Sequence, residues 1–389
     1  MVDSFRYKKR AIIRHYVFRL PIMPHRLSHW FKEWFNPYKR YQHQRAMHAI
    51  RLALAVVSTI LIAYLGNIEH GEWIAMTVFV LLGSVPYQGA INSKAYERII
   101  GTLLGMAIGI ALIWLNHHLL HNSPLYFIAI AVISAVSGWH TLGNYGYAAM
   151  LAGLTMAMLL GNVSDNWLHA GIIRAVNVII GVFIVLVASA LIPIKSMLTW
   201  RFLLSDNLAT CAHQFSLITV HKALPQETQN ALWLEQRSLN ARLVKSRSLL
   251  APTAHESKIN LALLDSIQQS QRNIVSSINL MLATVPKLPK ARLSIEDEQL
   301  LSRHFATLQH DLHRASKLLK GEWRHPIAIC FPEEAQVRTI AAKLPFETQG
   351  FVWTSLNIRS ELANLLALLQ SQRDKWLTAA EKAKLGVES

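Results

Sequence analysis

The segment Arg98-Ile-Ile-Gly101-Thr102-Leu-Leu-Gly105-Met-Ala-Ile-Gly109 opens an apolar run that continues to Leu115. Its three glycines stand at i, i+4 and i+8, so a helix over this segment places all three on one face. Such a face weakens a helix in water, but in a membrane it lets another helix approach to backbone contact. Arg98 stands one turn before the first glycine. A close-packed seam with a cation at its mouth indicates a multi-helix membrane protein that handles anions, not a simple anchor.

The composition places the apolar part of the chain between two basic parts. The 389 residues are 52% hydrophobic and only 16% charged, which is low for a soluble protein. Residues 1–46, 47–194 and 195–389 carry net charges of +9, 0 and +7. We therefore expect a basic cytoplasmic N-terminal arm (1–46), a transmembrane domain (47–194) and a cytoplasmic domain (195–389). Basic residues beside membrane spans follow from the positive-inside bias and anionic lipid, so no nucleic acid partner is expected.

Six apolar runs predict six transmembrane helices. A straight span needs about 20 residues, a length that the first, third and sixth runs reach easily. The second is short and stops at Pro86, and short spans are tolerated where polar flanks complete them or where they line a cavity. The runs are 47–65, 73–85, 98–119, 124–140, 145–161 and 167–194.

The charges of the connections predict the orientation. Residues 66–72, 116–123 and 162–166, which would face outward, contain no Lys or Arg, whereas both long flanks are rich in them. This predicts that both termini are cytoplasmic. Tryptophans fall at span ends, as interfacial anchors do: Trp73, Trp114, Trp139 and Trp167.

The last 195 residues have helical periodicity, so the whole chain is expected to be all-α. A segment at about 350–379 places Leu362, Leu365, Leu366 and Leu369 on one face. We expect five or six cytoplasmic helices with a core of their own. Cys211 and Cys330 have no metal-ligand spacing and form no disulfide framework.

Two motifs resemble the fusaric acid resistance/aromatic acid exporter (FUSC) family. The first, Arg98-Ile-Ile-Gly101-Thr102-Leu-Leu-Gly105, is similar to the family's R-x-x-G-T-x-x-G core. The second, Arg174-Ala-Val-Asn177-Val-Ile-Ile-Gly181, resembles its last span, which closes at Pro193. Further similarity to the short bacterial branch lies in Ser248-Leu-Leu-Ala-Pro252, Gln271-Arg272-Asn273 and Gly350-Phe-Val-Trp353.

The resemblance implies an exporter of small organic anions, above all aromatic or hydrophobic carboxylic acids, in a bacterial inner membrane. It also implies proton-driven export, which nothing in composition or spacing shows. Larger exporters repeat the unit of six spans plus soluble domain, whereas this chain has one unit, so a homodimer is expected. A distant likeness to the aluminium-activated malate channels of plants suggests a dimeric anion pore.

Arg174 is the sharpest candidate for the substrate pathway. It lies seven residues past Trp167, about 10 Å along a helix, a depth at which snorkelling is strained. Its guanidinium would attract a carboxylate, and Asn177 shares its face at i+3. The alternative is a structural ion pair with Asp165 or another nearby acid.

The other candidates keep simpler alternatives. Arg98, within about a turn of the predicted inner end, either lines the pathway or snorkels, and Thr102 either lines the pathway or bonds back to its own helix. For Arg51 we favour snorkelling. The remaining candidates are helix-packing residues: Gly101, Gly105, Gly109 and Gly181.

The sequence contains no nucleophile elbow, P-loop, HExxH or dinucleotide fingerprint, so no enzyme, cofactor or metal is expected. Three functions remain: an exporter, a dimeric anion channel, and a membrane-anchored scaffold with a cytoplasmic partner. An arginine at depth favours the first two. The expected partners are a small organic anion, membrane lipid and a second copy of the chain.

Overall fold

The structure is a computed structural model in which every described element is helical. It describes residues 36–120, 123–161, 167–220, 226–284, 293–323, 325, 327, 329, 331–378 and 381–383. A short helix, α3 (Pro37–Gln42), is the described part of an N-terminal unit, residues 1–43, and Asn36 caps it by accepting a hydrogen bond from the Tyr38 amide at 3.0 Å. The apolar helices are α4 (Gln44–Leu65), α5 (Glu72–Ser84), α6 (Gln88–Leu115) with the π-turn η1 (Asn116–Leu120), α7 (Pro124–Thr141), α8 (Gly146–Leu160) and α9 (Trp167–Leu191).

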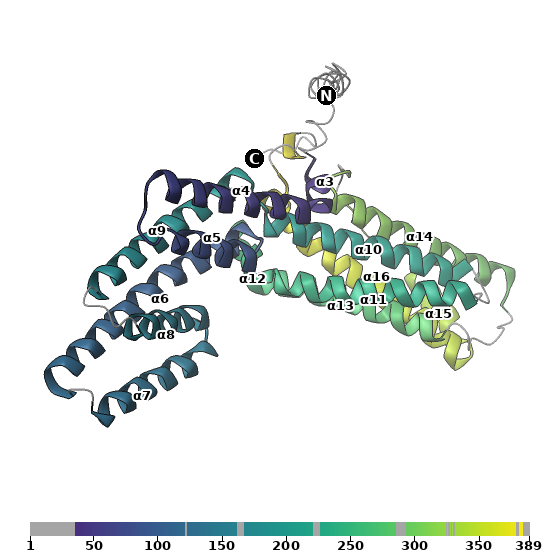
Figure 1. Cartoon of the computed structure of the whole chain (residues 1–389). Helices are drawn as coiled ribbons and strands as arrows, with labels where there is room; N and C mark the ends of the chain where they lie inside the picture. The colour runs from purple at the N-terminus through teal and green to yellow at the C-terminus, as the bar shows by residue number, and fades with distance from the viewer. Residues whose placement is uncertain are drawn as a thin grey trace, which may run out of the picture. The chain divides into compact units, whose positions relative to one another are not determined.

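The apolar helices include four that are long and apolar enough to cross a membrane, within the described part of the chain. They are Gln44–Leu65, Gln88–Leu119, Pro124–Thr141 and Gly171–Leu191. The shorter α5 and α8 have 13 and 15 residues. Each packs between longer helices, α5 against α4 and α9 and α8 between α6 and α7 (Figure 1). The chain is therefore an all-α polytopic membrane protein.

One boundary differs from the prediction for the third span. Helix α6 begins at Gln88, ten residues before the apolar run at Arg98. Its first turns contain good helix formers, and Ile91 and Ala95 lie buried in the core. The apolar run alone understates the helix because this amphipathic portion also packs against protein.

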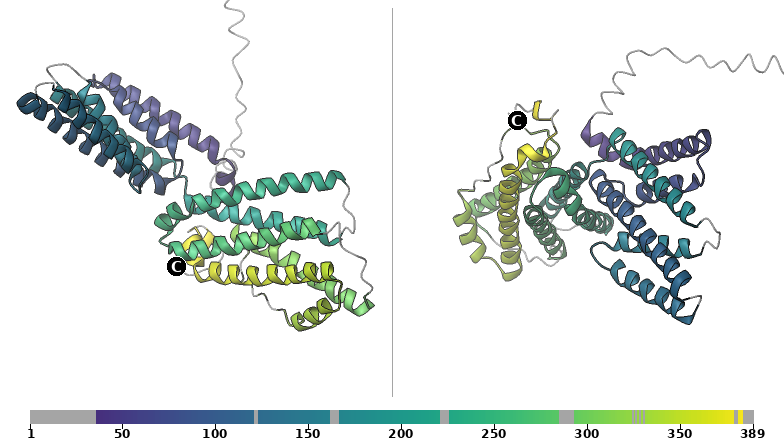
Figure 2. Two further views of the ribbon diagram at one scale, coloured as in Figure 1. Left: turned by 90° about the horizontal axis from the view of Figure 1, so that it is seen from below. Right: turned by 90° about the vertical axis from the view of Figure 1, so that its left-hand side faces the viewer.

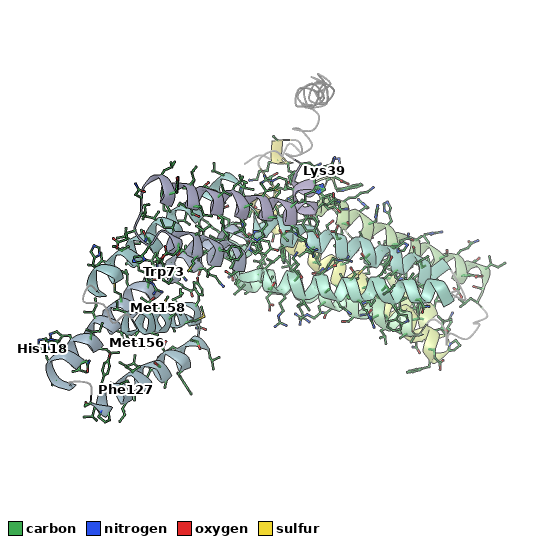
Figure 3. The ribbon with its side chains drawn as sticks, viewed as in Figure 1. Lys39, Trp73, His118, Phe127, Met156 and Met158 are labelled. Atoms are coloured by element: carbon green, nitrogen blue, oxygen red, sulfur yellow. The ribbon has the colours of Figure 1, made fainter. Side chains whose placement is uncertain are left out.

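The core of the apolar part joins α4, α5, α6 and α9. Its buried members are Ala55, Val78, Leu81, Leu82, Ile91, Ala95, Val178, Val182 and Val185. By contrast, α7 has no buried residue among those described, and Phe127 on it is largely exposed (Figure 3). Exposed apolar side chains on a helix of this length are the surface that a membrane covers.

The three glycines of α6 face α8 at backbone distance. A Cβ added at Gly101 would lie 2.5 Å from the Ala148 carbonyl oxygen, and one at Gly105 would lie 2.8 Å from Ala152 Cα. At Gly109 a Cβ would meet Leu159 Cδ2 at 2.8 Å. Ala148 and Ala152 are themselves four residues apart, so two small-residue patterns pack against each other along parallel helices.

We expect Gly105→Leu to disrupt this seam, because no backbone can shift enough to admit the side chain. The cost is about 3 kcal/mol or more, at the upper end of overpacking in a close-packed core. Thermal melting and gel filtration in detergent measure it. Gly138→Leu on α7 is the matched control, since nothing lies within 4 Å of a Cβ there. Equal stability of the two variants would contradict the seam.

The described residues after α9 form a bundle of five long helices. They are α10 (Ser196–Val220), α11 (Gln226–Ser248), α13 (Leu261–Thr284), α14 (Ile295–Leu319) and α16 (Phe346–Ser371); α12 (Leu250–Ser257), α15 (Glu334–Ala342) and α17 (Arg373–Trp376) are short. The long helices lie side by side (Figures 1 and 2). The leucines at 362, 365, 366 and 369 are all buried, but α16 ends at Ser371, not near residue 379.

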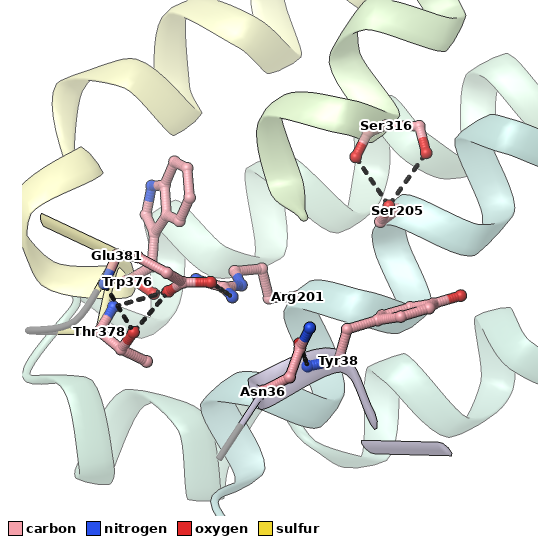
Figure 4. A network of polar contacts seen from close by, with 8 residues as sticks. All are labelled: Asn36, Tyr38, Arg201, Ser205, Ser316, Trp376, Thr378 and Glu381. Atoms are coloured by element: carbon pink, nitrogen blue, oxygen red, sulfur yellow. Dashed lines mark hydrogen bonds and ion pairs between the residues drawn. The ribbon is translucent and has the colours of Figure 1, made fainter. Parts of the chain in front are cut away.

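A buried ion pair ties the end of the chain to α10 (Figure 4). Arg201 donates from Nη1 to Glu381 Oε2 at 2.8 Å and to the Trp376 carbonyl at 2.9 Å. Glu381 also accepts from the amide and hydroxyl of Thr378. Burial alone would raise the pKa of Glu381, but the hydrogen bonds and charge of Arg201 lower it. The carboxylate therefore stays ionised, and the ion pair holds the segment around Glu381 against α10.

His304 of α14 is another buried polar group of the bundle. Its Nε2 lies 2.9 Å from Ser355 Oγ, and its ring packs against Phe331. Burial, with a smaller contribution from the charge of Arg359, lowers the pKa of His304 to about 4. The ring is neutral in the folded protein at neutral pH.

The depressed pKa predicts a pH-dependent stability. An unfolded chain takes up a proton at His304 near pH 6.5, whereas the folded protein resists it until about pH 4. Stability is thus fully present above pH 6.5 and falls between pH 6.5 and 4, by roughly 3 kcal/mol. Melting curves of wild type and His304→Asn across this range test it. The advantage of the wild type should shrink as the pH falls; a constant gap would contradict a neutral His304.

Candidate functional site

Arg174 lies buried in the apolar helices with its guanidinium on an aromatic ring. It is 9% exposed, and its Cζ is 4.1 Å from the centroid of Trp73 on α5. Nη1 points at the sulfur of Met158 at 2.7 Å, and Nε is buried without a hydrogen-bond partner. The ring face stabilises the cation but accepts no conventional hydrogen bond from Nε. The guanidinium therefore has unused donor capacity.

A cavity of about 280 Å³ lies beside this guanidinium. It is lined by His70, Glu72, Trp73, Met106, Thr155, Met158, Leu159, Gly171 and Arg174. The residues come from α5, α6, α8, α9 and the connection before α5. The lining combines one buried cation with an indole and two thioethers. It also includes the Glu72 carboxylate, which lies 3.2 Å from His70 Nδ1 and forms no ion pair with Arg174.

Arg98 of α6 contacts α5 about one helical turn away from Trp73, the residue that Arg174 contacts. Its Nη2 is 3.4 Å from Thr77 Oγ1, and its Nε is also buried without a partner. Thr77 and Trp73 are four residues apart, so the two arginines lie about one helical turn apart along α5, near enough for their charges to interact. Arg98 is only 5% exposed, so its side chain is enclosed by protein instead of extending over a lipid-facing surface.

No carboxylate forms an ion pair with Arg98 or Arg174 among the residues that the structure describes. Asp165, the alternative partner considered for Arg174, lies outside those residues. A buried charge without a counter-ion is expensive, and in membrane proteins it commonly marks a pathway or a binding site. The two arginines thus form a positive site that calls for an anion.

The side chains of Asn177 and Thr102 donate hydrogen bonds to backbone carbonyls of the protein. Asn177 is 1% exposed, and its Nδ2 donates to the carbonyls of Glu69 and His70, both at 2.9 Å. It fixes the connection between α4 and α5, in which His70 has a positive φ of 53°. Thr102 donates to the Arg98 carbonyl of its own helix at 2.8 Å. Neither residue lines the cavity beside Arg174.

Gly181 holds α9 against α5 at the level of the site. A Cβ there would lie 2.8 Å from Thr77 Cβ and 3.0 Å from the Ile74 carbonyl oxygen. This contact brings α9 close enough for Arg174 to reach Trp73. The sequence spacing of Arg174 and Gly181, seven residues or two turns, already puts both on one face.

Arg51 is a structural residue that sequence reasoning missed. It is 1% exposed, so the snorkelling interpretation is wrong. Its guanidinium reaches the carbonyls of Pro86 at 2.8 Å and Ile192 at 3.4 Å, just beyond the C-terminal ends of α5 and α9. A cation there meets the unpaired carbonyls and negative dipole ends of both helices. No local sequence signal indicates this, because the partners are 35 and 141 residues away.

Nearly the whole chain matches a known protein family. The model of the Fusaric acid resistance protein family (FUSC) matches residues 45–385. The chain belongs to this family. The resemblance carried by the Arg98 and Arg174 motifs is thereby confirmed, and the family consists of transporters, not enzymes.

Two relatives of this FUSC protein differ in how much of the chain they match. "Inner membrane protein YeeA" of Escherichia coli (strain K12) is 27% identical over 290 residues, which are 71% of this chain and 78% of the relative. "p-hydroxybenzoic acid efflux pump subunit AaeB" of Escherichia coli O9:H4 (strain HS) is 26% identical over 169 residues, which are 40% of this chain and 25% of the pump subunit. One relative thus matches most of the length, and the other links part of the chain to a named efflux activity.

We expect Asn177→Leu to loosen the α4–α5 connection. The change removes both hydrogen bonds to the partly buried carbonyls of Glu69 and His70, at about 0.5–1.5 kcal/mol each. Hydrogen–deuterium exchange of residues 66–72 should speed up by at least about tenfold, and Val176→Leu, whose side chain is exposed on the same helix, should leave it unchanged. Unchanged exchange combined with lost transport would instead make Asn177 a substrate contact.

Proposed function

We propose that this protein exports small organic anions, aromatic or hydrophobic carboxylates, across the inner membrane of a bacterium. The observation that carries the proposal is the buried Arg174, which has no acidic partner among described residues, faces a cavity and rests on Trp73. The AaeB relative is named for efflux of p-hydroxybenzoic acid, which supports the same substrate class. Arg98 would serve the same pathway one turn away.

The chemistry of the cavity suits such a substrate. A guanidinium binds a carboxylate through two parallel hydrogen bonds, and the unpartnered Nε of Arg174 supplies one donor. Trp73, Met106 and Met158 offer an aromatic face and polarisable sulfurs to a substrate ring. Its volume of about 280 Å³ lies just below the usual range of ligand pockets, which begins at about 300 Å³. A single-ring acid is the size class that this favours.

We propose six spans, with α5 and α8 completing the four long helices, and cytoplasmic termini. We also propose the domain boundaries expected from charge: an N-terminal arm (1–46), a transmembrane domain (47–194) and a cytoplasmic domain (195–389). A homodimer is proposed because larger family members repeat the unit that this chain has once. The 169 matched residues are 40% of this chain and 25% of the AaeB subunit, so the pump subunit is the longer of the two proteins.

We expect Arg174→Gln to reduce transport by about tenfold to a hundredfold. This loss corresponds to one charge-assisted hydrogen bond, about 1.5–3 kcal/mol. Uptake of radiolabelled p-hydroxybenzoate into inside-out proteoliposomes measures it, with Arg174→Lys retaining part of the flux. Arg247→Gln on α11, an exposed arginine, is the matched control. Wild-type flux in a stably folded Arg174→Gln would contradict the proposal.

The same vesicles separate a carrier from a channel. Saturable uptake that an uncoupler abolishes supports a proton-driven carrier. Current that rises with substrate concentration at a held potential without saturation supports a pore instead. The Arg174 prediction applies to both, because either needs the substrate anion to pass the same buried cation.

A further inference from the structure

A second group of polar atoms without partners lies beside Arg98, away from the Arg174 cavity. The hydroxyl of Tyr147, at the start of α8, is buried and has no hydrogen-bond partner, as is the case for Arg98 Nε. The hydroxyl lies close enough to Arg98 to accept from its guanidinium, and it is also within range of the charge of Glu97. Buried polar atoms are nearly always satisfied by protein, water or ligand. The hydroxyl proton of Tyr147 and the Nε–H of Arg98 are thus two donors without an acceptor in the described part of the chain.

A third cation lies at the same place. The Nζ of Lys94 is 5.0 Å from the centroid of the Tyr147 ring. Lys94 and Arg98 are four residues apart on α6, so their side chains lie on one face one turn apart. No ion pair of Lys94 occurs within the described chain. The acid nearest in sequence, Glu97, is contacted by Ser93 Oγ at 3.5 Å and lines a different groove, between α6, α7 and α8.

The three cations follow one another along the helix axes. From the N-terminal side of α6 the order is Lys94 and Arg98, at an interval of one turn. Arg98 meets Thr77 of α5, and one turn further along α5 Arg174 rests on Trp73. Only three residues join α5 to α6, so the two helices run in opposite directions. The order Lys94, Arg98, Arg174 therefore runs in a single direction, from the N-terminal side of α6 toward the cavity.

We propose that Lys94, Arg98 and Tyr147 form an inner anion station, which takes the carboxylate of the transported anion before it reaches the Arg174 cavity. This rests on the proposed function. The Tyr147 hydroxyl donates to a carboxylate oxygen, Arg98 Nε donates to the other, and the charge of Lys94 lowers the barrier to entry from the α6 N-terminal side. The anion satisfies both orphaned donors and separates two like charges. The station determines access, whereas Arg174 determines retention.

The decisive variant is Tyr147→Phe, which keeps the ring under Lys94 and removes only the hydroxyl. In inside-out proteoliposomes, where the proposed cytoplasmic side faces the bath, we expect the KM for p-hydroxybenzoate to rise about threefold to tenfold with kcat retained. Equilibrium binding of the same acid to the purified protein should change less than the KM. Tyr145→Phe, two residues away and 76% exposed, is the matched control. An unchanged KM in Tyr147→Phe overturns the station.

A second pair of variants keeps the test decisive where Tyr147→Phe alters folding, as judged by thermal melting. Lys94→Gln should raise the KM and Lys94→Arg should restore it, because charge rather than shape matters there. Equal KM values for both overturn the station. A failure of the proposed function gives a different result, namely wild-type flux in Arg174→Gln. If Arg174→Gln loses flux but Tyr147→Phe keeps the wild-type KM, only the inner anion station is contradicted.

Discussion

The contact between the glycines of α6 and the alanines of α8 constrains the rest of the apolar bundle. Backbone contact at Gly101 and Gly105 fixes both the separation and the rotation of α6. Once that rotation is set, Arg98, three residues before Gly101, is directed at Thr77 of α5. Another glycine, Gly181, brings α9 close to α5 at Thr77, the residue that Arg98 contacts. Small residues therefore position both buried cations without touching any ligand.

The energetics of the site follow from what surrounds those cations. Trp73 offers the quadrupole of its ring to Arg174, and Thr77 offers one hydroxyl to Arg98. Neither removes the cost of two like charges in a membrane interior. Arg51 shows the contrast, because carbonyls at the ends of α5 and α9 accept from its guanidinium. The Nε of all three arginines is buried without a partner, so the difference lies in their terminal nitrogens. Those of Arg51 reach two carbonyls, whereas Arg98 reaches one hydroxyl and Arg174 one thioether.

Local patterns in the sequence predicted the helices and the shared faces well, and they could not predict partners far away in the chain. The glycine spacing indicates one packed face, but Ala148 and Ala152 look like ordinary residues of an apolar run. Trp73 fits an interfacial anchor by position, yet it lies under Arg174. Asn177 shares a face with Arg174 by spacing, and its amide is used by carbonyls more than 100 residues away. The rotation of each helix, which only tertiary packing sets, decides these cases.

The most direct measurement of the central claim is a cryo-EM map of the full-length protein in lipid nanodiscs with saturating p-hydroxybenzoate. The account predicts density for one ring between Trp73 and the methionines of the cavity, with the carboxylate within hydrogen-bond distance of the Arg174 guanidinium. The Arg174→Gln protein under the same conditions should lack that density. An acidic side chain of the protein itself on the wild-type guanidinium, with the substrate absent from the cavity, would contradict it.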